Sequence, residues 1–255
     1  MKRKLIGALA CLCGMAGAAL AADYEGFTFG AGVHTTEGDY GTSASTRVTS
    51  IALTGRYDTP QWIFRATLPW LSVSGSTGVV PGVGRVRGGF AADASASGLG
   101  DVVLSATHKT WHDAGLQAGL DLTGRIKLGT ADEDERLGTG EHDLGIQADV
   151  FKSFGTLTGF AGLGYTIYGD SPALRLRDVF NATFGASYRL DERDSVGLAY
   201  DQRDPVVRGA AELSELSLFW SRQVTRGWKT QAYFLVGLED GSPDWGAGLS
   251  AAYAF

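Results

Sequence analysis

Apolar and polar residues alternate with a period of two along most of the chain. In the clearest case, residues 116–128, every even position is apolar or glycine and most odd positions are polar or charged. Successive side chains of a β-strand point to opposite faces of its sheet, so this pattern predicts a strand with one apolar and one polar face. The same pattern predicts strands at 24–34, 46–57, 62–73, 100–110, 115–128, 143–153, 156–168, 178–190, 195–202, 212–224, 228–239 and 245–255.

Two kinds of connection alternate between these twelve strands. The short ones are 58–61, 112–114, 154–155, 191–194 and 225–227, and the other series is 35–45, 74–99, 129–142, 169–177, 203–211 and 240–244. An even number of antiparallel strands with short turns at one end and longer loops at the other is typical of outer-membrane barrels. A strand of about 11 residues tilted by about 45° rises about 26 Å, close to the height of their apolar band. We therefore predict an all-β fold, a transmembrane antiparallel up-and-down β-barrel of 12 strands.

The placement of aromatic residues decides which face of the barrel points outward, because a soluble barrel with an apolar interior would alternate in the same way. One group lies beside the short turns or the C-terminus: Tyr57, Trp62, Trp111, Tyr188, Trp228, Tyr253 and Phe255. A second group lies near the longer loops: Trp70, Tyr165, Tyr168 and Trp245. Two aromatic belts at opposite strand ends are what the two membrane interfaces favour. The apolar faces are therefore expected to meet lipid.

The N-terminal residues have the pattern of a secretory signal peptide. Basic Lys2, Arg3 and Lys4 precede an apolar stretch, 5–20, that ends in a small-x-small cleavage site at 19–21. We expect residues 1–21 to be removed and residues 22–255 to form a single domain, the barrel. Both cysteines lie in the removed segment, so neither a disulfide nor a thiolate site is expected in the mature chain.

The C-terminal strand carries a second targeting feature. Every odd position from 245 to 255 is apolar or aromatic, and every even position is glycine, serine or alanine. A last strand that ends in this way resembles the assembly signal of bacterial outer-membrane barrels, which implies such a role for Tyr253 and Phe255. The expected location is the Gram-negative outer membrane, with membrane lipid, lipopolysaccharide and the outer-membrane assembly machinery as partners.

Charge excludes one class of partner. Without the leader the chain has 19 Lys and Arg against 28 Asp and Glu, a net charge of −9, which argues against nucleic acid. The acidic run 132–135 with Glu141 reads as a solvated loop surface. We predict neither a metal site nor a cofactor.

The polar faces of the predicted strands carry charges of both signs. Twelve charged side chains are expected to line the lumen: Arg56, Arg65, Asp101, Lys109, Asp121, Arg125, Lys127, Asp149, Arg189, Asp201, Glu215 and Lys229. They could line an open channel, or they could pair into a salt-bridged plug that fills a narrow barrel. Twelve strands lie between the filled eight-stranded and the open sixteen-stranded barrels, so we favour the channel.

The longest predicted connection, 74–99, is a candidate constriction. It is rich in glycine and serine and contains Arg85 and Arg87, with no acid before Asp93. Folded into the mouth, it would narrow the pore and favour anions. The alternative is a surface loop.

The four histidines are the candidate catalytic bases if the protein is an outer-membrane hydrolase. We place His108 and His112 at the periplasmic interface, with His112 in a tight turn, and His34 and His142 near the outer rim. None belongs to a recognisable nucleophile and base arrangement, and only His142 with Asp143 forms a pair. We predict no catalytic residue and no enzyme.

Two segments resemble a known family. Ser97–Ala106 (SGLGDVVLSA) and Gly138–Ala148 (GTGEHDLGIQA), followed by 151–155 and 162–165, are similar to outer-membrane proteins assigned to transport in the meta-cleavage pathway of phenol degradation. The resemblance covers residues 97–190, and His108 stands where the family pattern has an aromatic residue. It implies passage of small, often aromatic molecules and supplies no catalytic residues. The predicted function is thus a passive channel or uptake protein for a small-molecule solute, with a filled structural or adhesive barrel and a hydrolase as alternatives.

Overall fold

The computed structural model describes residues 25–76, 78–86, 94–169 and 174–255. The long strands are β1 (Gly26–Gly38), β2 (Thr46–Asp58), β3 (Trp62–Gly75), β7 (Val102–Asp113), β8 (Ala118–Leu128), β9 (Asp143–Phe154), β10 (Leu157–Ile167), β11 (Val179–Arg189), β12 (Asp194–Arg203), β13 (Leu213–Gln223), β14 (Trp228–Gly237) and β15 (Trp245–Ala254). The shorter strands are β4 (Val79–Val80), β5 (Gly84–Arg85) and β6 (Ala94–Leu99). The predicted signal peptide and Arg87 lie outside the described residues.

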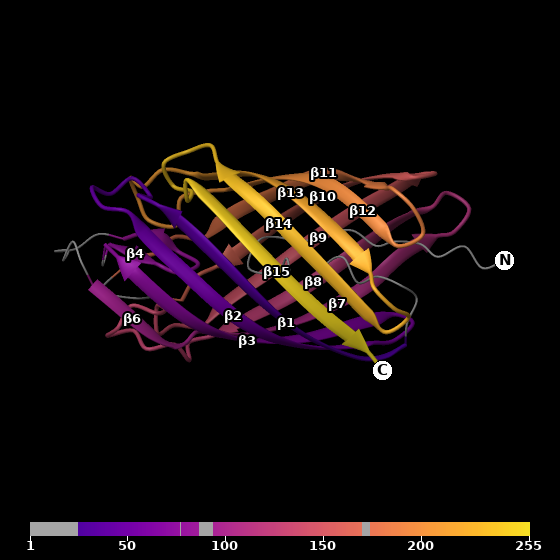
Figure 1. The fold of residues 1–255 in the computed structure, drawn as a ribbon. Helices are drawn as coiled ribbons and strands as arrows, with labels where there is room; N and C mark the ends of the chain where they lie inside the picture. Colours follow the sequence, from indigo (N-terminus) through magenta and orange to yellow (C-terminus); the bar gives the residue numbers. More distant parts are fainter. Residues whose placement is uncertain (1–24, 77, 87–93, 170–173) are drawn as a thin grey trace.

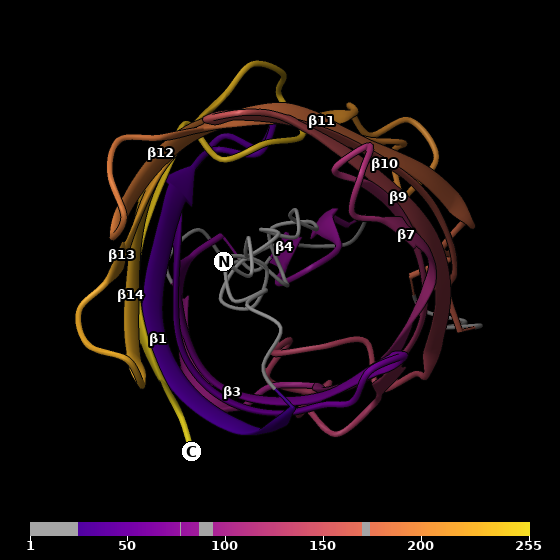
Figure 2. The ribbon, with the colours of Figure 1, turned by 90° about the vertical axis from the view of Figure 1, so that its right-hand side faces the viewer.

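The long strands form one closed antiparallel barrel (Figures 1 and 2). Each strand pairs with its neighbour in the chain, and β1 pairs with both β2 and β15, which closes the ring. Because β6 and β7 both pair with β3, they occupy a single position in the wall, and the barrel has 12 strands. The predicted fold class is confirmed. Closure matters because hydrocarbon offers no partner for the backbone groups of a free sheet edge.

The segment 94–101 is the main difference from the predicted strands. Residues 94–99 belong to the wall as β6, so the predicted loop 74–99 was too long and the predicted strand 100–110 started too late. The register shifts by one residue between the pairs Trp70 with Leu99 and Thr67 with Val103. Opposite this shift is Pro69, which has no N–H to donate to the ladder and accepts a bond from the Gly100 N–H (2.8 Å). Alternation is interrupted there, so the sequence pattern predicts the start of the strand at residue 100 instead of residue 94.

A second irregularity lies near the end of β7. The pairing with β8 shifts between Lys109 and Trp111, so one extra residue reverses the alternation. Trp111 thereby returns to the outer face, 47% exposed. His112 is part of the strand, and the turn that was predicted at 112–114 lies at 114–117.

Short and long connections lie at opposite ends of the barrel, as predicted. The short ones are 59–61, 114–117, 155–156, 190–193 and 224–227. The two-residue turn after β9 uses Gly155 at φ 70°, a conformation that glycine adopts without a Cβ penalty. In the turn after β11 the Asp191 carboxylate accepts the Arg193 and Asp194 N–H groups (2.7 and 2.8 Å), which lower the pKa of Asp191. No helix in the described ranges is both long and apolar enough to span a bilayer.

Candidate functional site

The two faces of the barrel wall differ in the way that a membrane barrel requires. Leu122 is 46% exposed on the outer face, whereas its neighbour Thr123 points to the interior and shares a 2.9 Å hydrogen bond with its cross-strand partner Thr107. The same contrast recurs along the long strands: most large apolar side chains are exposed, and most polar ones on the alternate positions are buried or half-buried. Exceptions are Leu71 and Leu235, which are buried on the interior face. An exposed apolar surface of this extent suits contact with lipid.

All twelve predicted charged residues lie on the interior face. They are Arg56, Arg65, Asp101, Lys109, Asp121, Arg125, Lys127, Asp149, Arg189, Asp201, Glu215 and Lys229, and every one is buried or half-buried. Their role in solute selection stays a prediction. Arg85 instead lies in the hairpin at the mouth, where it is exposed and donates to the Gly41 carbonyl.

Several of these charges are held by specific partners. Arg56 binds both oxygens of Asp58 at 2.6 Å in a bidentate pair, the strongest geometry for such contacts. Lys127 bridges Asp101 (3.0 Å) and Asp143 (2.9 Å). The last of these links ties two neighbouring strands together at the loop end of the barrel.

Other interior charges bind neutral groups. The Thr183 hydroxyl donates to Asp201 (2.6 Å), and the Gln147 amide donates to Asp149 (2.7 Å). Arg125 donates to the Thr166 hydroxyl (3.3 Å), and Lys109 donates to the Thr59 carbonyl (3.1 Å). These contacts hold the interior side chains in set positions.

The interior charges are unevenly distributed along the barrel axis. Near the short turns, Arg56 lies directly across from Arg65, and Lys229 is also in this half. Near the long loops, Asp201 lies directly across from Glu215, and one Glu215 oxygen is buried without a hydrogen-bond partner. Like charges therefore lie directly across from each other at both ends of the barrel, with Asp58 beside the first pair and Arg203 beside the second.

Four interior aromatic residues were missed by the sequence analysis. Phe151, Phe160 and Phe219 are at most 8% exposed, and Tyr233 packs against their cluster. The three phenylalanines sit on mostly polar interior faces, and Tyr233 shares its interior face with Lys229, Gln231 and the buried Leu235. A signal was present in the sequence, because Phe151 lies out of phase with the apolar residues at 144, 146, 148 and 150. The interior therefore carries aromatic side chains in addition to the predicted charges.

Each of these aromatic rings covers a glycine on the adjacent strand. The directly paired residues are Phe151 with Gly119, Phe160 with Gly185, Phe219 with Gly197, and Tyr233 with Gly248. A Cβ added at these glycines would lie 2.5, 2.5, 2.3 and 2.3 Å from the ring. The glycines make room for rings to lie against the inner wall.

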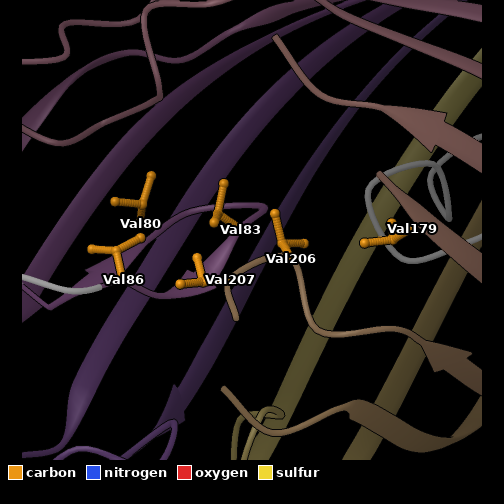
Figure 3. Close-up of a cluster of buried hydrophobic side chains, with 6 residues drawn as sticks. All are labelled: Val80, Val83, Val86, Val179, Val206 and Val207. Atoms are coloured by element: carbon orange, nitrogen blue, oxygen red, sulfur yellow. The ribbon is translucent and has the colours of Figure 1, made fainter. Parts of the chain in front are cut away.

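The mouth of the barrel holds an apolar cluster, which we call the valine cluster: Val80, Val83, Val86, Val179, Val206 and Val207 (Figure 3). Three members come from the β4–β5 hairpin, which lies inside the ring of strands in Figure 2. Arg203 of β12 holds the hairpin by donating to the carbonyls of Gly82 (2.7 Å) and Val83 (3.2 Å).

Two tyrosines near the mouth take part in this packing. Tyr168, predicted as a membrane-belt residue, instead packs partly buried against the valine cluster. Tyr40 is 8% exposed and shares a 3.0 Å hydrogen bond with Thr36. Burial raises the pKa of Tyr40 to about 12. Both tyrosines are thus fixed by packing or hydrogen bonding at the loop end of the barrel.

The histidines show no catalytic arrangement. His142 accepts the Gly129 N–H (3.1 Å), whereas Asp143 binds Lys127 on the other face of the strand. His112, predicted as a periplasmic interface residue, bonds the interior Asp121 at 2.6 Å. Across the described part of the chain, no group of three or more His, Cys, Asp or Glu residues could hold a metal ion.

The outer wall has a hollow of about 620 Å³. Small residues at 159, 161 and 186 form its floor, and its sides include Phe184, Leu198 and Leu216. These side chains are 40–55% exposed on the lipid face, so the hollow is a feature of the membrane surface.

Comparison with solved structures shows a shared barrel fold. The KdgM porin matches with a TM-score of 0.54 and 9% identity, covering 89% of this chain and 99% of the porin. The "TodX deltaS2S3 mutant monoaromatic hydrocarbon channel" matches with 0.54 and 12% identity over 98% and 96% of the two chains. The translocator domain of autotransporter NalP from Neisseria meningitidis matches with 0.52 and 14% identity over 91% and 90%.

Sequence comparisons place the chain in a family. Curated protein sequences give no match. A family model described as "Putative MetA-pathway of phenol degradation" matches residues 22–255, the whole chain after the expected leader. The chain belongs to this family of the phenol-degradation pathway.

Proposed function

We propose that this protein is an uptake channel of the bacterial outer membrane for small aromatic or hydrophobic compounds. The observation that carries the proposal is the set of interior aromatic residues, Phe151, Phe160, Phe219 and Tyr233, inside a closed transmembrane barrel. Aromatic side chains on the inner wall do not contact lipid, so the membrane does not explain their presence there. They make part of the inner wall aromatic, which suits an aromatic solute better than a charged one.

The valine cluster supports the same class of solute. A solute that enters past the hairpin contacts buried valines, with Arg203 bound to hairpin carbonyls at their edge. Loss of hydration there costs a hydrophobic compound little, whereas an unpaired polar or charged group pays a large penalty. The mouth therefore favours apolar solutes. The family membership points in the same direction, because its description names phenol degradation.

We also propose roles for the two ends of the chain in targeting and for the interior charges in the path of the solute. Residues 1–21 direct export and are removed, and Tyr253 with Phe255 present the last strand to the assembly machinery. The folded barrel contacts membrane lipid and lipopolysaccharide. The twelve interior charges line the solute path and set its preference among polar substituents.

Uptake of N-phenyl-1-naphthylamine by cells that express the full chain tests the proposal. An intact lipopolysaccharide layer excludes this fluorescent aromatic compound, so we expect faster uptake than in cells with an empty vector. Phe160→Ala should reduce the gain, whereas Phe184→Ala, an outer-face phenylalanine 55% exposed, should keep it.

Uptake by these cells and two measurements on the purified protein separate the channel from the alternatives. If the protein folds in the outer membrane and uptake equals the vector control, the channel proposal fails. Absence of single-channel current from the purified protein in planar bilayers would then favour a filled barrel with a structural or adhesive role. Hydrolysis of ester substrates by the purified protein would instead favour the hydrolase.

A further inference from the structure

The hollow of about 620 Å³ on the outer wall lies across β9 to β12, which are neighbours in the barrel (Figure 2). One row of directly paired residues runs along it: Lys152 lies across from Gly159, and Gly159 lies across from Ala186. The next row toward the long loops places Ala161 across from Phe184, whose side chain forms one side of the hollow. The hollow therefore begins at a cation and continues along small side chains.

The fold itself does not require glycine at position 159. Gly159 has no positive φ, and nothing lies within 4 Å of a Cβ added there. A glycine inside a strand weakens the strand and often marks the close approach of a ligand. Side chains beside an unfilled space also lose dispersion contacts on that side. The hollow thus has the shape of a site for an apolar occupant.

Lys152 is a charged residue on the lipid-facing side of the wall. It is exposed at the edge of the hollow, and its Nζ lies 5.5 Å from the centre of the ring of Phe154, the last residue of β9. In the part of the chain that the structure describes, no carboxylate lies within ion-pair distance of Lys152, whereas Arg222 on the same outer face pairs with Asp194. Lysine in such a position extends its ammonium group toward the membrane interface. Lys152 therefore provides a positive charge for a lipid headgroup.

We propose that the hollow binds one anionic phospholipid of the periplasmic leaflet. An acyl chain lies along Gly159, Ala161 and Ala186, and the Lys152 ammonium donates hydrogen bonds to the phosphate. The position of the cation favours a phospholipid, because the short-turn end of an outer-membrane barrel faces the periplasm and the leaflet on that side consists of phospholipid. The volume lies within the range of about 300 to 1,000 Å³ that is common for ligand sites.

Native mass spectrometry of the protein, purified from outer membranes in detergent, tests the site. The protein is titrated with phosphatidylglycerol and with a diacylglycerol that has the same acyl chains and no phosphate. We expect one phosphatidylglycerol to bind per chain, and to bind more tightly than the diacylglycerol. Equal retention of the two lipids by the unmodified protein overturns the proposal, and this comparison does not depend on the folding of any variant.

Lys152→Gln tests the contact with the phosphate. The variant should weaken phosphatidylglycerol binding about fivefold, the effect of one lysine near an anionic lipid surface, and leave diacylglycerol binding unchanged. Arg222→Gln is the matched control, because Arg222 is also an exposed cation near the short turns but lies outside the hollow and is paired. Equal affinities of the two variants for phosphatidylglycerol would remove Lys152 from the site and overturn the proposal.

Ala161→Leu tests the contact with the acyl chain, because the larger side chain fills the hollow. Both lipids should bind more weakly to this variant. Ala232→Leu makes the same exchange on the outer face of β14, outside the hollow, and should bind both lipids as the unmodified protein does. Heat-modifiable gel mobility shows whether each variant is folded.

A second copy of the chain is the other occupant that the experiment can detect. If the unmodified protein is a dimer, and Ala161→Leu makes it a monomer without changing lipid binding, the hollow is a contact between two copies and the lipid proposal is wrong. Identical lipid binding by folded Ala161→Leu and Ala232→Leu, with no change in mass, shows lipid held elsewhere on the wall and also overturns the proposal.

Discussion

Phe160 in β10 lies directly across from Gly185 in β11, and a Cβ added at Gly185 would lie 2.5 Å from the ring. The same added atom would lie 2.3 Å from the Leu198 carbonyl oxygen. A ring can shift, but a backbone carbonyl in a closed barrel cannot move without disturbing its ladder. Gly185 is therefore required by its neighbours on both sides.

Gly185→Ala should destabilise the barrel because the added methyl group overpacks the inner wall. Overpacking of a dense interior costs about 1 to 3 kcal/mol. Gly159→Ala is the matched control on the paired strand, since nothing lies within 4 Å of its added Cβ. Urea unfolding of the detergent-folded proteins measures both, and equal midpoints would contradict the role assigned to Gly185.

Leu122→Arg and Thr123→Arg should differ sharply although the residues are neighbours. Arginine on the lipid face near the midplane costs about 2 to 4 kcal/mol, whereas the Thr123 side chain faces the interior. We expect Leu122→Arg to lose the folded band in heat-modifiable gels and Thr123→Arg to keep it with altered ion preference. Equal loss in both variants would reverse the assignment of the faces.

The strands of the wall could be predicted from the sequence because each has one apolar and one polar face. This alternation can be recognised in a single strand without knowing which strands it pairs with. The prediction failed where alternation breaks for a local reason, at Pro69 with Gly100 and at the bulge before Trp111. Both irregularities depend on the adjacent strand. A single strand's pattern does not contain that information.

The interior was only partly predictable. Charges on the polar face were easy to place, since a charged side chain that faces lipid near the midplane is costly. Phe219 and Tyr233 could not be placed in the same way, because their fit depends on Gly197 and Gly248 in neighbouring strands. The hairpin that carries Val80 and Val83 is fixed by Arg203, 120 or more residues away in the chain.

Deletion of Phe255 should leave a secreted chain that assembles poorly. Its N–H donates to the Phe27 carbonyl (3.0 Å), and its ring contacts Tyr253 (4.9 Å between centroids) and Phe29 (6.0 Å). The deletion removes contacts across the β1–β15 seam together with the expected assembly signal. The folded fraction in outer-membrane extracts is the measurement, and an unchanged fraction would refute both roles.

Arg203→Met should open the mouth of the barrel. The variant removes the donors to Gly82 and Val83, so the β4–β5 hairpin would keep the valine cluster and the bond from Arg85 to the Gly41 carbonyl but lose its anchor on β12. Single-channel conductance in planar bilayers should rise, and selectivity should move toward cations because a guanidinium is lost near the mouth. Arg222→Met is the control, since Arg222 is exposed on the outer face and pairs with Asp194 at 3.4 Å.

Replacement of residues 78–86 by a short Gly-Ser segment distinguishes the effect of the hairpin on conductance from the effect of the Arg203 charge. The exchange spares β6, which belongs to the wall, and it removes three members of the valine cluster together with Arg85. Conductance should rise further than in Arg203→Met, because the obstruction itself is absent.

If conductance is unchanged in both variants while the intact protein passes current, the path avoids the hairpin and the constriction lies deeper, among the interior aromatic residues. If no variant passes current, the interior is closed along its length and the filled-barrel alternative is favoured.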